Sequence, residues 1–210
     1  MQKKELQIYL QPTETINFKH PLVLDFISIH TNKGDTKKAQ AISLYKAVRD
    51  TIPYDAFTFS VQKENYKASA TIDAGIGFCT TKSIVYTACC RAIGIPAKLG
   101  FADVKNHLST NVLRLMLETD IYYWHAYVLL YLDNKWVKAT PVFDTQLCEK
   151  YKITSLQFDG SNDSIYHPYD QEGNQHMEYL NDRGTYADMP FEEMVADMFR
   201  YYPAFMERCE

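Results

Sequence analysis

The sequence has little net charge and no long hydrophobic segment. Its formal charge is −4 over 210 residues, so it lacks the basic surface on which non-specific binding to nucleic acid depends. No stretch approaches the roughly 18 apolar residues of a membrane-spanning helix, and residues 1–8 contain no apolar run typical of a signal peptide. We therefore expect a cytoplasmic protein that binds neither nucleic acid nor a membrane.

The spacing of the cysteines argues against two classes of protein. The five cysteines are an odd number without framework spacing, which fits a reducing compartment better than a disulfide scaffold. No Cys-x-x-Cys pair is present, so we expect no structural zinc site.

Asp159, Asp163 and Asp170 do not follow the spacing of a calcium loop, and His167 and His176 are more typical of surface groups than of ligands. We expect no metal and no cofactor.

Beyond these absences, the composition is that of an ordinary globular protein, with 46% hydrophobic and 23% charged residues. The length fits one domain, and no repeat, low-complexity segment or linker interrupts it. Sixteen tyrosines and eleven phenylalanines are many for this length. They indicate either aromatic packing in the core or an aromatic-lined groove.

The segment around Cys79 combines glycines with a helical pattern. Two glycines precede Cys79, and Gly94 and Pro96 end the pattern as a C-cap and a helix breaker. Cys79 therefore lies in the first turn of a buried helix, where the helix dipole favours a nucleophilic thiolate. The alternative is that Cys79 is a small buried hydrophobic residue. The apolar residues of the helix recur with the spacing of one face: Ile84, Val85, Ala88, Cys89, Ala92 and Ile93.

Residues 124–144 predict a hairpin that carries His125. The Asp133-Asn134 turn aligns two strands so that His125 lies opposite Val142. Residues two apart along a strand share a face, so Asp144 becomes the diagonal neighbour of His125. Diagonal neighbours lie roughly 7–8 Å apart, within reach of a carboxylate–imidazole hydrogen bond.

Together these motifs resemble the transglutaminase-like superfamily, whose fold is similar to that of papain-type thiol proteases. The motifs are a cysteine at a helix start after Gly-x-Gly-Phe, a histidine within Trp-His-Ala, and an aspartate after Lys-Trp-Val-Lys-Ala-Thr-Pro. The resemblance is to the bacterial branch and is strongest over about residues 40–145. It implies Cys79 as the nucleophile, His125 as the general base and acid, and Asp144 as the residue that orients the imidazole.

The expected fold class is α+β: a papain-like, transglutaminase-like core in which the helix with the nucleophile packs on an antiparallel sheet. We expect a single domain over residues 1–210, with its core at about 36–145 and helical and irregular flanks at 1–35 and 146–210. Residues 103–122 are an insertion that forms either a groove wall or part of the core. The remaining patterns predict helices at about 22–29, 35–50, 112–117 and 188–202, a strand at 97–102 and a loop at 54–72.

The resemblance implies an enzyme, a cysteine hydrolase or acyltransferase that works through a Cys-His-Asp triad and a thioester. We expect hydrolysis of an amide in a peptide or protein, as by a protease or amidase, because excluding water requires a dedicated dry tunnel. Protein-glutamine amine transfer is one alternative, and a catalytically idle binding module is the alternative of another class. The sequence lacks the Arg-Gly-Gly-x-Cys signature of arylamine acetyl transfer and the zinc cysteines of peptide glycanases. It leaves the oligomeric state open.

An acyl-transfer site also needs donors for the oxyanion of its tetrahedral intermediate. The backbone N–H of Cys79, at the start of its helix, is one expected donor. We expect the second from an aromatic or amide side chain within residues 54–72.

Overall fold

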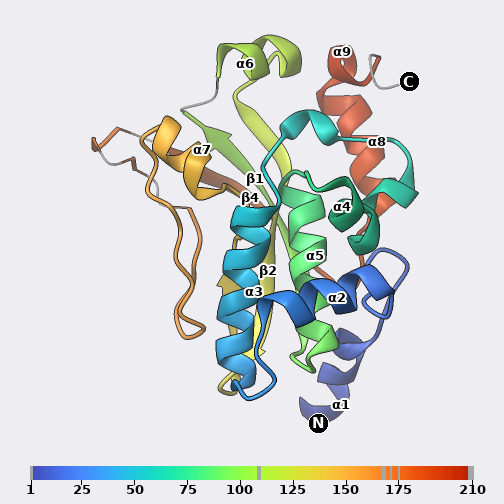
Figure 1. The fold of residues 1–210 in the computed structure, drawn as a ribbon. Helices are drawn as coiled ribbons and strands as arrows, with labels where there is room; N and C mark the ends of the chain where they lie inside the picture. The colour runs from blue at the N-terminus through green and yellow to red at the C-terminus, as the bar shows by residue number, and fades with distance from the viewer. Residues whose placement is uncertain (1, 108–109, 167–168, 171, 175, 208–210) are drawn as a thin grey trace.

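The computed structural model describes residues 2–107, 110–166, 169–170, 172–174 and 176–207 of an α+β fold (Figure 1). Its centre is an antiparallel sheet with the strand order β3-β2-β1-β4. Each strand pairs with its neighbours in sequence except β4, which returns from the C-terminal part of the chain to the free edge of β1. The strands are β1 (Ala97–Asn106), β2 (Ile121–Leu132), β3 (Lys135–Ala139) and β4 (Met177–Tyr186).

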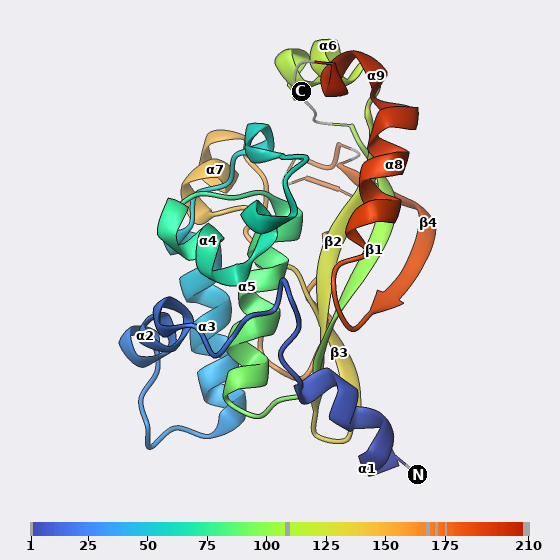
Figure 2. The ribbon, with the colours of Figure 1, turned by 90° about the vertical axis from the view of Figure 1, so that its right-hand side faces the viewer.

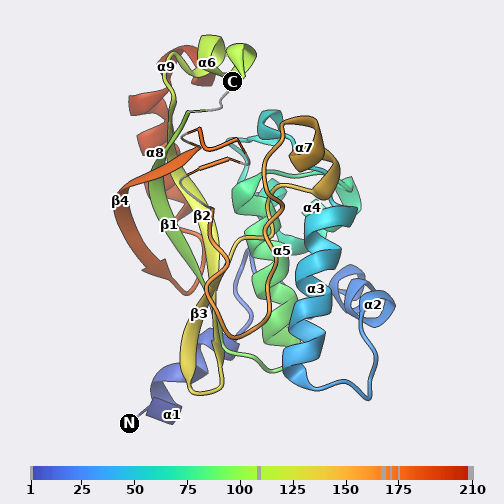
Figure 3. The same cartoon turned by 90° about the vertical axis from the view of Figure 1, so that its left-hand side faces the viewer.

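Helices lie on two sides of this sheet (Figures 2 and 3). Helix α5 packs against β1 and β2, and α2, α3 and α4 surround it on the same side, whereas α8 stands on the other side and contacts β2. The short α6 lies beside α9 at one end of the sheet. The helices are α1 (Gln2–Glu5), α2 (Pro21–His30), α3 (Lys37–Thr51), α4 (Ala68–Ala74), α5 (Cys79–Ala92), α6 (Asn111–Leu117), α7 (Thr145–Lys150), α8 (Phe191–Tyr201) and α9 (Pro203–Met206), with 3-10 turns at Leu6–Leu10, Ala56–Thr58 and Lys63–Tyr66.

Helix α5 confirms the prediction of a buried helix that begins at Cys79. Its start is fixed by Thr81, whose hydroxyl accepts from the N–H of Phe78 at 3.0 Å. Gly77 permits this cap, because a Cβ there would lie 2.5 Å from the Thr81 hydroxyl oxygen. At the other end Gly94 takes a left-handed conformation with φ of 77° and ends the helix. The side chains of 79–91 are all buried, including the charged ones, so the helix is the centre of the core.

The hairpin of β2 and β3 is confirmed in its turn and register. Asp133 and Asn134 both have positive φ, 48° and 64°, as the two central residues of a type I′ turn require. Leu132 pairs with Lys135, and the ladder continues to Val128 and Ala139. It ends there, so the predicted pairing of His125 with Val142 lies beyond the last paired residues.

Several other elements agree with the sequence, and some differ. Helices α2, α3, α6 and α8 and strand β1 lie where they were predicted, although Thr36 rather than Asp35 caps α3. The prediction of loop structure over 54–72 is wrong in part, because α4 begins at Ala68. Strand β4 was not predicted: its exposed residues follow no alternating pattern, and its pairing with β1 contains two bulges. The insertion is shorter than expected because β1 continues to Asn106.

Within the described residues, no helix combines the length and the hydrophobicity that crossing a membrane requires. The cysteines there, Cys79, Cys89, Cys90 and Cys148, are all buried free thiols. No group of three or more potential metal-ligating side chains occurs in the same part of the chain.

Candidate active site

Cys79 occupies the first position of α5, at the end of a segment that is fixed on both sides. Residues 53–55 run beside Gly77, with hydrogen bonds from the Asp55 N–H to the Gly77 carbonyl at 2.9 Å and from the Gly77 N–H to the Pro53 carbonyl at 3.1 Å. The thiol is 9% exposed. The backbone of Ala126, the residue after His125, lies close enough to the Cys79 sulfur to act on the pKa of the thiol. The helix start and strand β2 therefore meet at the sulfur.

A bulge in β2 sets the position of His125. Tyr123 and Trp124 together lie opposite the single residue Asp103 of β1, and Trp124 has a left-handed φ of 60°. That conformation is rare and strained for a bulky side chain. Bulges next to active sites redirect the side chain that follows, and here that side chain is the imidazole of His125.

The backbone groups that the bulge leaves unpaired are satisfied by two side chains. The carboxylate of Asp103 accepts from the Trp124 N–H at 3.2 Å. The hydroxyl of Tyr202 accepts from the Tyr123 N–H at 2.7 Å and donates to the Ile121 carbonyl at 2.8 Å. Because each group has a partner, the strained conformation is held in place beside His125.

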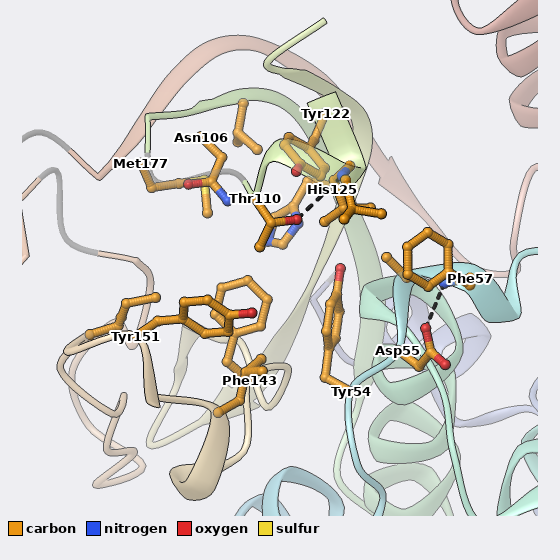
Figure 4. Close-up of a pocket in the computed structure, with 16 residues that line it drawn as sticks. Tyr54, Asp55, Phe57, Asn106, Thr110, Tyr122, His125, Phe143, Tyr151 and Met177 are labelled. Carbon is orange, nitrogen blue, oxygen red and sulfur yellow. Dashed lines mark hydrogen bonds between the residues drawn. The ribbon is translucent and has the colours of Figure 1, made fainter. Parts of the chain in front are cut away.

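Cys79 and His125 line one pocket. It is a small cavity of about 80 Å³ between the start of α5, the end of the insertion and helices α8 and α9. A larger cavity of about 330 Å³ adjoins it. His125 and Tyr54 line both cavities, whereas Cys79 lines only the smaller one. In Figure 4 the ring of Tyr54 stands at the centre of the larger cavity, with its hydroxyl toward His125 and Tyr122.

Burial shifts the pKa values of Cys79 and His125 in the directions that favour the neutral form of each group. Burial raises the pKa of the Cys79 thiol, although the backbone of Ala126 and the hydroxyl of Thr80 act in the opposite direction. Burial, together with nearby His176, lowers the pKa of His125 to about 4. Desolvation therefore acts against the thiolate that the helix start favours. Both shifts favour a neutral thiol and a neutral imidazole near neutral pH.

The imidazole of His125 is 5% exposed and retains hydrogen-bonding capacity. Its Nε2 has no partner among the described residues. A buried polar atom without a partner is uncommon in folded proteins, and a catalytic role is one of its explanations. A neutral imidazole with an unpaired nitrogen can accept a proton.

Asp144 lies at the start of α7, and its carboxylate has two backbone partners. One oxygen accepts from the Leu147 N–H at 2.8 Å as the N-cap of that helix, and the other accepts from the Tyr54 N–H at 3.1 Å. The predicted hydrogen bond to the His125 imidazole is not made in this arrangement. The paired part of β3 ends before Thr140, so the backbone no longer follows the diagonal geometry that placed Asp144 beside His125. Asp144 instead fixes the backbone of Tyr54.

Comparison with known families shows to which superfamily the chain belongs. The family model of the transglutaminase-like superfamily matches residues 27–141, more than half of the chain. The chain belongs to the transglutaminase-like superfamily. The match includes Cys79 and His125 and ends three residues before Asp144. No curated protein matches the chain significantly.

Two solved structures share the fold of this superfamily member. One is a "putative cysteine protease" from Cytophaga hutchinsonii, with a TM-score of 0.55 and 15% identity over 88% of this chain. The chain spans 47% of the length of that protein. The other is an arylamine N-acetyltransferase from Salmonella typhimurium, with a TM-score of 0.52 and 12% identity, covering 91% of this chain and 70% of the other. Identities this low establish the papain-like fold and nothing finer.

The sequence did not identify three features of this transglutaminase-like site. Tyr54 lies in a segment without periodicity, and only the general expectation of an aromatic donor from residues 54–72 pointed to it. His176 was expected on the surface but is 1% exposed, and the ring of Tyr166 packs between it and His125. The wall formed by α8 and α9 comes from a stretch whose position relative to Cys79 no motif indicated. His167 lies outside the described residues.

The other thiols of the described residues line neither of the two cavities. Cys89 and Cys90 are fully buried in α5, and burial raises the pKa of each. Burial also raises the pKa of Cys148, to about 11. Cys209 lies outside the described residues.

Proposed function

We propose that the protein hydrolyses an amide bond of a peptide or protein by thiol-dependent acyl transfer, with Cys79 as nucleophile and His125 as general base and acid. One observation carries the proposal: Cys79, at a helix start, lines the same buried pocket as an imidazole with an unpaired nitrogen. The membership in a superfamily of thiol enzymes supports it.

The reaction divides into two steps. The Cys79 sulfur attacks the amide carbonyl while His125 takes the thiol proton, and His125 then gives that proton to the leaving nitrogen. The C–N bond breaks and a thioester with Cys79 remains. Water attacks the thioester with His125 as base, which releases the carboxylic acid and restores the thiol. A neutral starting pair suits this sequence, because His125 begins as an acceptor.

Two donors are available for the oxyanion. The backbone N–H of Cys79 lies at the start of α5, where it has no partner within the helix. Burial and the neighbouring Cys79 sulfur raise the pKa of the Tyr54 phenol, so its hydroxyl stays protonated and can donate. We assign Tyr54 as the second donor. Asp144 completes the site as a positioning residue that holds the Tyr54 backbone, in place of the direct orienting role that the sequence suggested.

The test is incubation with a panel of acyl peptide amides and an added primary amine, with products identified by mass spectrometry. We expect the free acid as the main product, formed by wild type and by Cys89→Ala but not by Cys79→Ala. Cys89→Ala is the matched control because it removes another buried thiol of the same helix. A Cys79-dependent amide of the added amine would make the protein a transferase. Binding without any Cys79-dependent product would make it a binding module.

A further inference from the structure

The small pocket in front of Cys79 is lined almost entirely by apolar and aromatic side chains. No Asp, Glu, Lys or Arg is among the described residues that line it. Its polar groups are the thiol, the imidazole, Thr80 and the hydroxyls of tyrosines. An unpaired charge in such a place loses its hydration without compensation, so the lining favours an uncharged occupant.

The residues that line the two cavities indicate which cavity receives the acyl group of a substrate and which receives the leaving group. The acyl group becomes bonded to Cys79, and Cys79 lines only the smaller cavity. The leaving nitrogen takes its proton from His125, which lines both. The larger cavity also presents polar side chains, among them Asp55, Asn106 and Thr110. The acyl chain therefore belongs in the small apolar pocket and the leaving group in the larger one.

One wall of the small pocket comes from outside the part of the chain that matches the superfamily. Met194 and Met198 lie one turn apart on α8, Tyr202 follows after another turn, and Phe205 belongs to α9. All four lie beyond residue 141, where the family match ends. Both methionines are buried, at 1% and 6% exposure.

A network of ion pairs and hydrogen bonds fixes α8 next to His125. Asp197 of α8 accepts from the indole N–H of Trp124 at 2.9 Å and from the Arg183 guanidinium at 2.5 Å. Arg183 also binds Asp103, the residue that holds the bulge. The Tyr202 hydroxyl is bonded to the β2 backbone at Tyr123, within the bulge, and at Ile121, just before it. The methionine wall is therefore positioned by the same contacts that position the imidazole.

We propose that this pocket is an acyl-binding subsite for an uncharged, apolar chain, and that α8 and α9 determine its length. This inference rests on the function proposed above and adds its substrate class. A volume of about 80 Å³ holds about five to eight water-sized groups. We expect acyl chains from butanoyl to hexanoyl to fill this pocket best, and a decanoyl chain to fit it less well.

The test is the steady-state hydrolysis of 4-nitrophenyl acetate, butanoate, hexanoate and decanoate, and of 4-nitrophenyl hydrogen succinate as the charged counterpart of the butanoate. We expect kcat/KM for butanoate or hexanoate to exceed that for the acetate, the decanoate and the succinate by about tenfold or more. Met198→Ala, which enlarges the pocket, should move the optimum to a longer chain. Phe199→Ala is the matched control, because that side chain is 41% exposed on the same helix and should leave the profile unchanged.

The outcomes separate this inference from the proposed function. Turnover that depends on Cys79 but is equal for all esters, or greatest for the succinate, would overturn the subsite and leave the hydrolase proposal standing. An unchanged optimum in folded Met198→Ala would overturn the role of α8. If Met198→Ala does not fold, the chain-length profile of the wild type still tests the subsite, and the profile of Met198→Leu still tests the role of α8. Loss of Cys79 dependence for every ester would overturn the proposed function as well.

Discussion

Replacing Asp144 tests whether it acts through Tyr54. Asp144→Ala removes the N-cap of α7 and the acceptor of the Tyr54 N–H. The lost cap costs about 0.5–2 kcal/mol, and with the unpaired Tyr54 N–H we expect the free energy of unfolding to fall by about 1–3 kcal/mol. Thr36→Ala is a matched control, because it removes the N-cap of α3 and should cost about 1 kcal/mol without affecting activity.

The activity of the same variant discriminates between two roles. If Tyr54 donates to the oxyanion, Tyr54→Phe should lower kcat by about 10²–10³-fold. Asp144→Ala should lower it by about 10- to 100-fold, because a displaced Tyr54 donates less well. Asp144→Asn should fall between wild type and Asp144→Ala, since one amide oxygen can still accept. Because both residues serve one hydrogen bond, the loss of kcat/KM in the double variant Asp144→Ala, Tyr54→Phe should be much smaller than the product of the two single losses.

The assay is a double-mutant cycle on kcat/KM, with thermal melts to establish that each variant is folded. The acid limb of the pH profile, which reports His125, should stay where it is in Asp144→Ala. Multiplicative effects of Asp144→Ala and Tyr54→Phe, or a shifted acid limb in Asp144→Ala, would refute this reasoning and return Asp144 to the direct orienting role.

Three further predictions follow from buried groups. Because catalysis needs neutral His125 and its pKa is lowered to about 4, kcat/KM should fall only as the pH drops through about 4; a limb near the ordinary histidine value of about 6.5 would contradict this. Burial lowers the pKa of Lys82 from 10.5 to about 7, so the unfolded chain binds more protons between these values and stability should rise with pH across that range. The rise is at most about 5 kcal/mol, and equilibrium unfolding of Lys82→Met should lack it; equal slopes for both proteins would refute it. Gly77→Ala should destabilise the fold by about 1–3 kcal/mol in urea unfolding, since its Cβ would clash with Thr81, and an unchanged midpoint would show that the helix start adapts.

The sequence predicts most reliably where short-range rules apply. The cap and breaker of α5 and the turn between β2 and β3 depend on neighbouring residues, so both elements and their register were predicted correctly. The family resemblance predicted that Cys79 and His125 share one site, because the motifs around both residues are those of the superfamily. The pattern of α8 likewise indicated a helix, but nothing in it indicated which side of the sheet it covers.

What the sequence did not predict depends on long-range contacts. The bulge at Trp124 is stabilised by Asp103 and Tyr202, which are distant in sequence. The prediction that Asp144 lies beside His125 assumed that the strand continues to Asp144, whereas the strand ends at Ala139. The expected thiolate depended on the helix start and its neighbour His125, whereas burial acts against it, and residues of α6, α8 and α9 that line the pocket are distant in sequence from Cys79.

The most direct test of the central claim is to trap the acyl-enzyme. The protein is mixed with excess 4-nitrophenyl hexanoate, quenched in acid within the first turnover and digested for peptide mapping by mass spectrometry. We predict one hexanoyl group on the peptide that contains Cys79, formed much more slowly in His125→Ala and not at all in Cys79→Ala. A hexanoyl group on another residue, or turnover that persists in Cys79→Ala, would contradict the assignment of Cys79 and His125 as the catalytic pair.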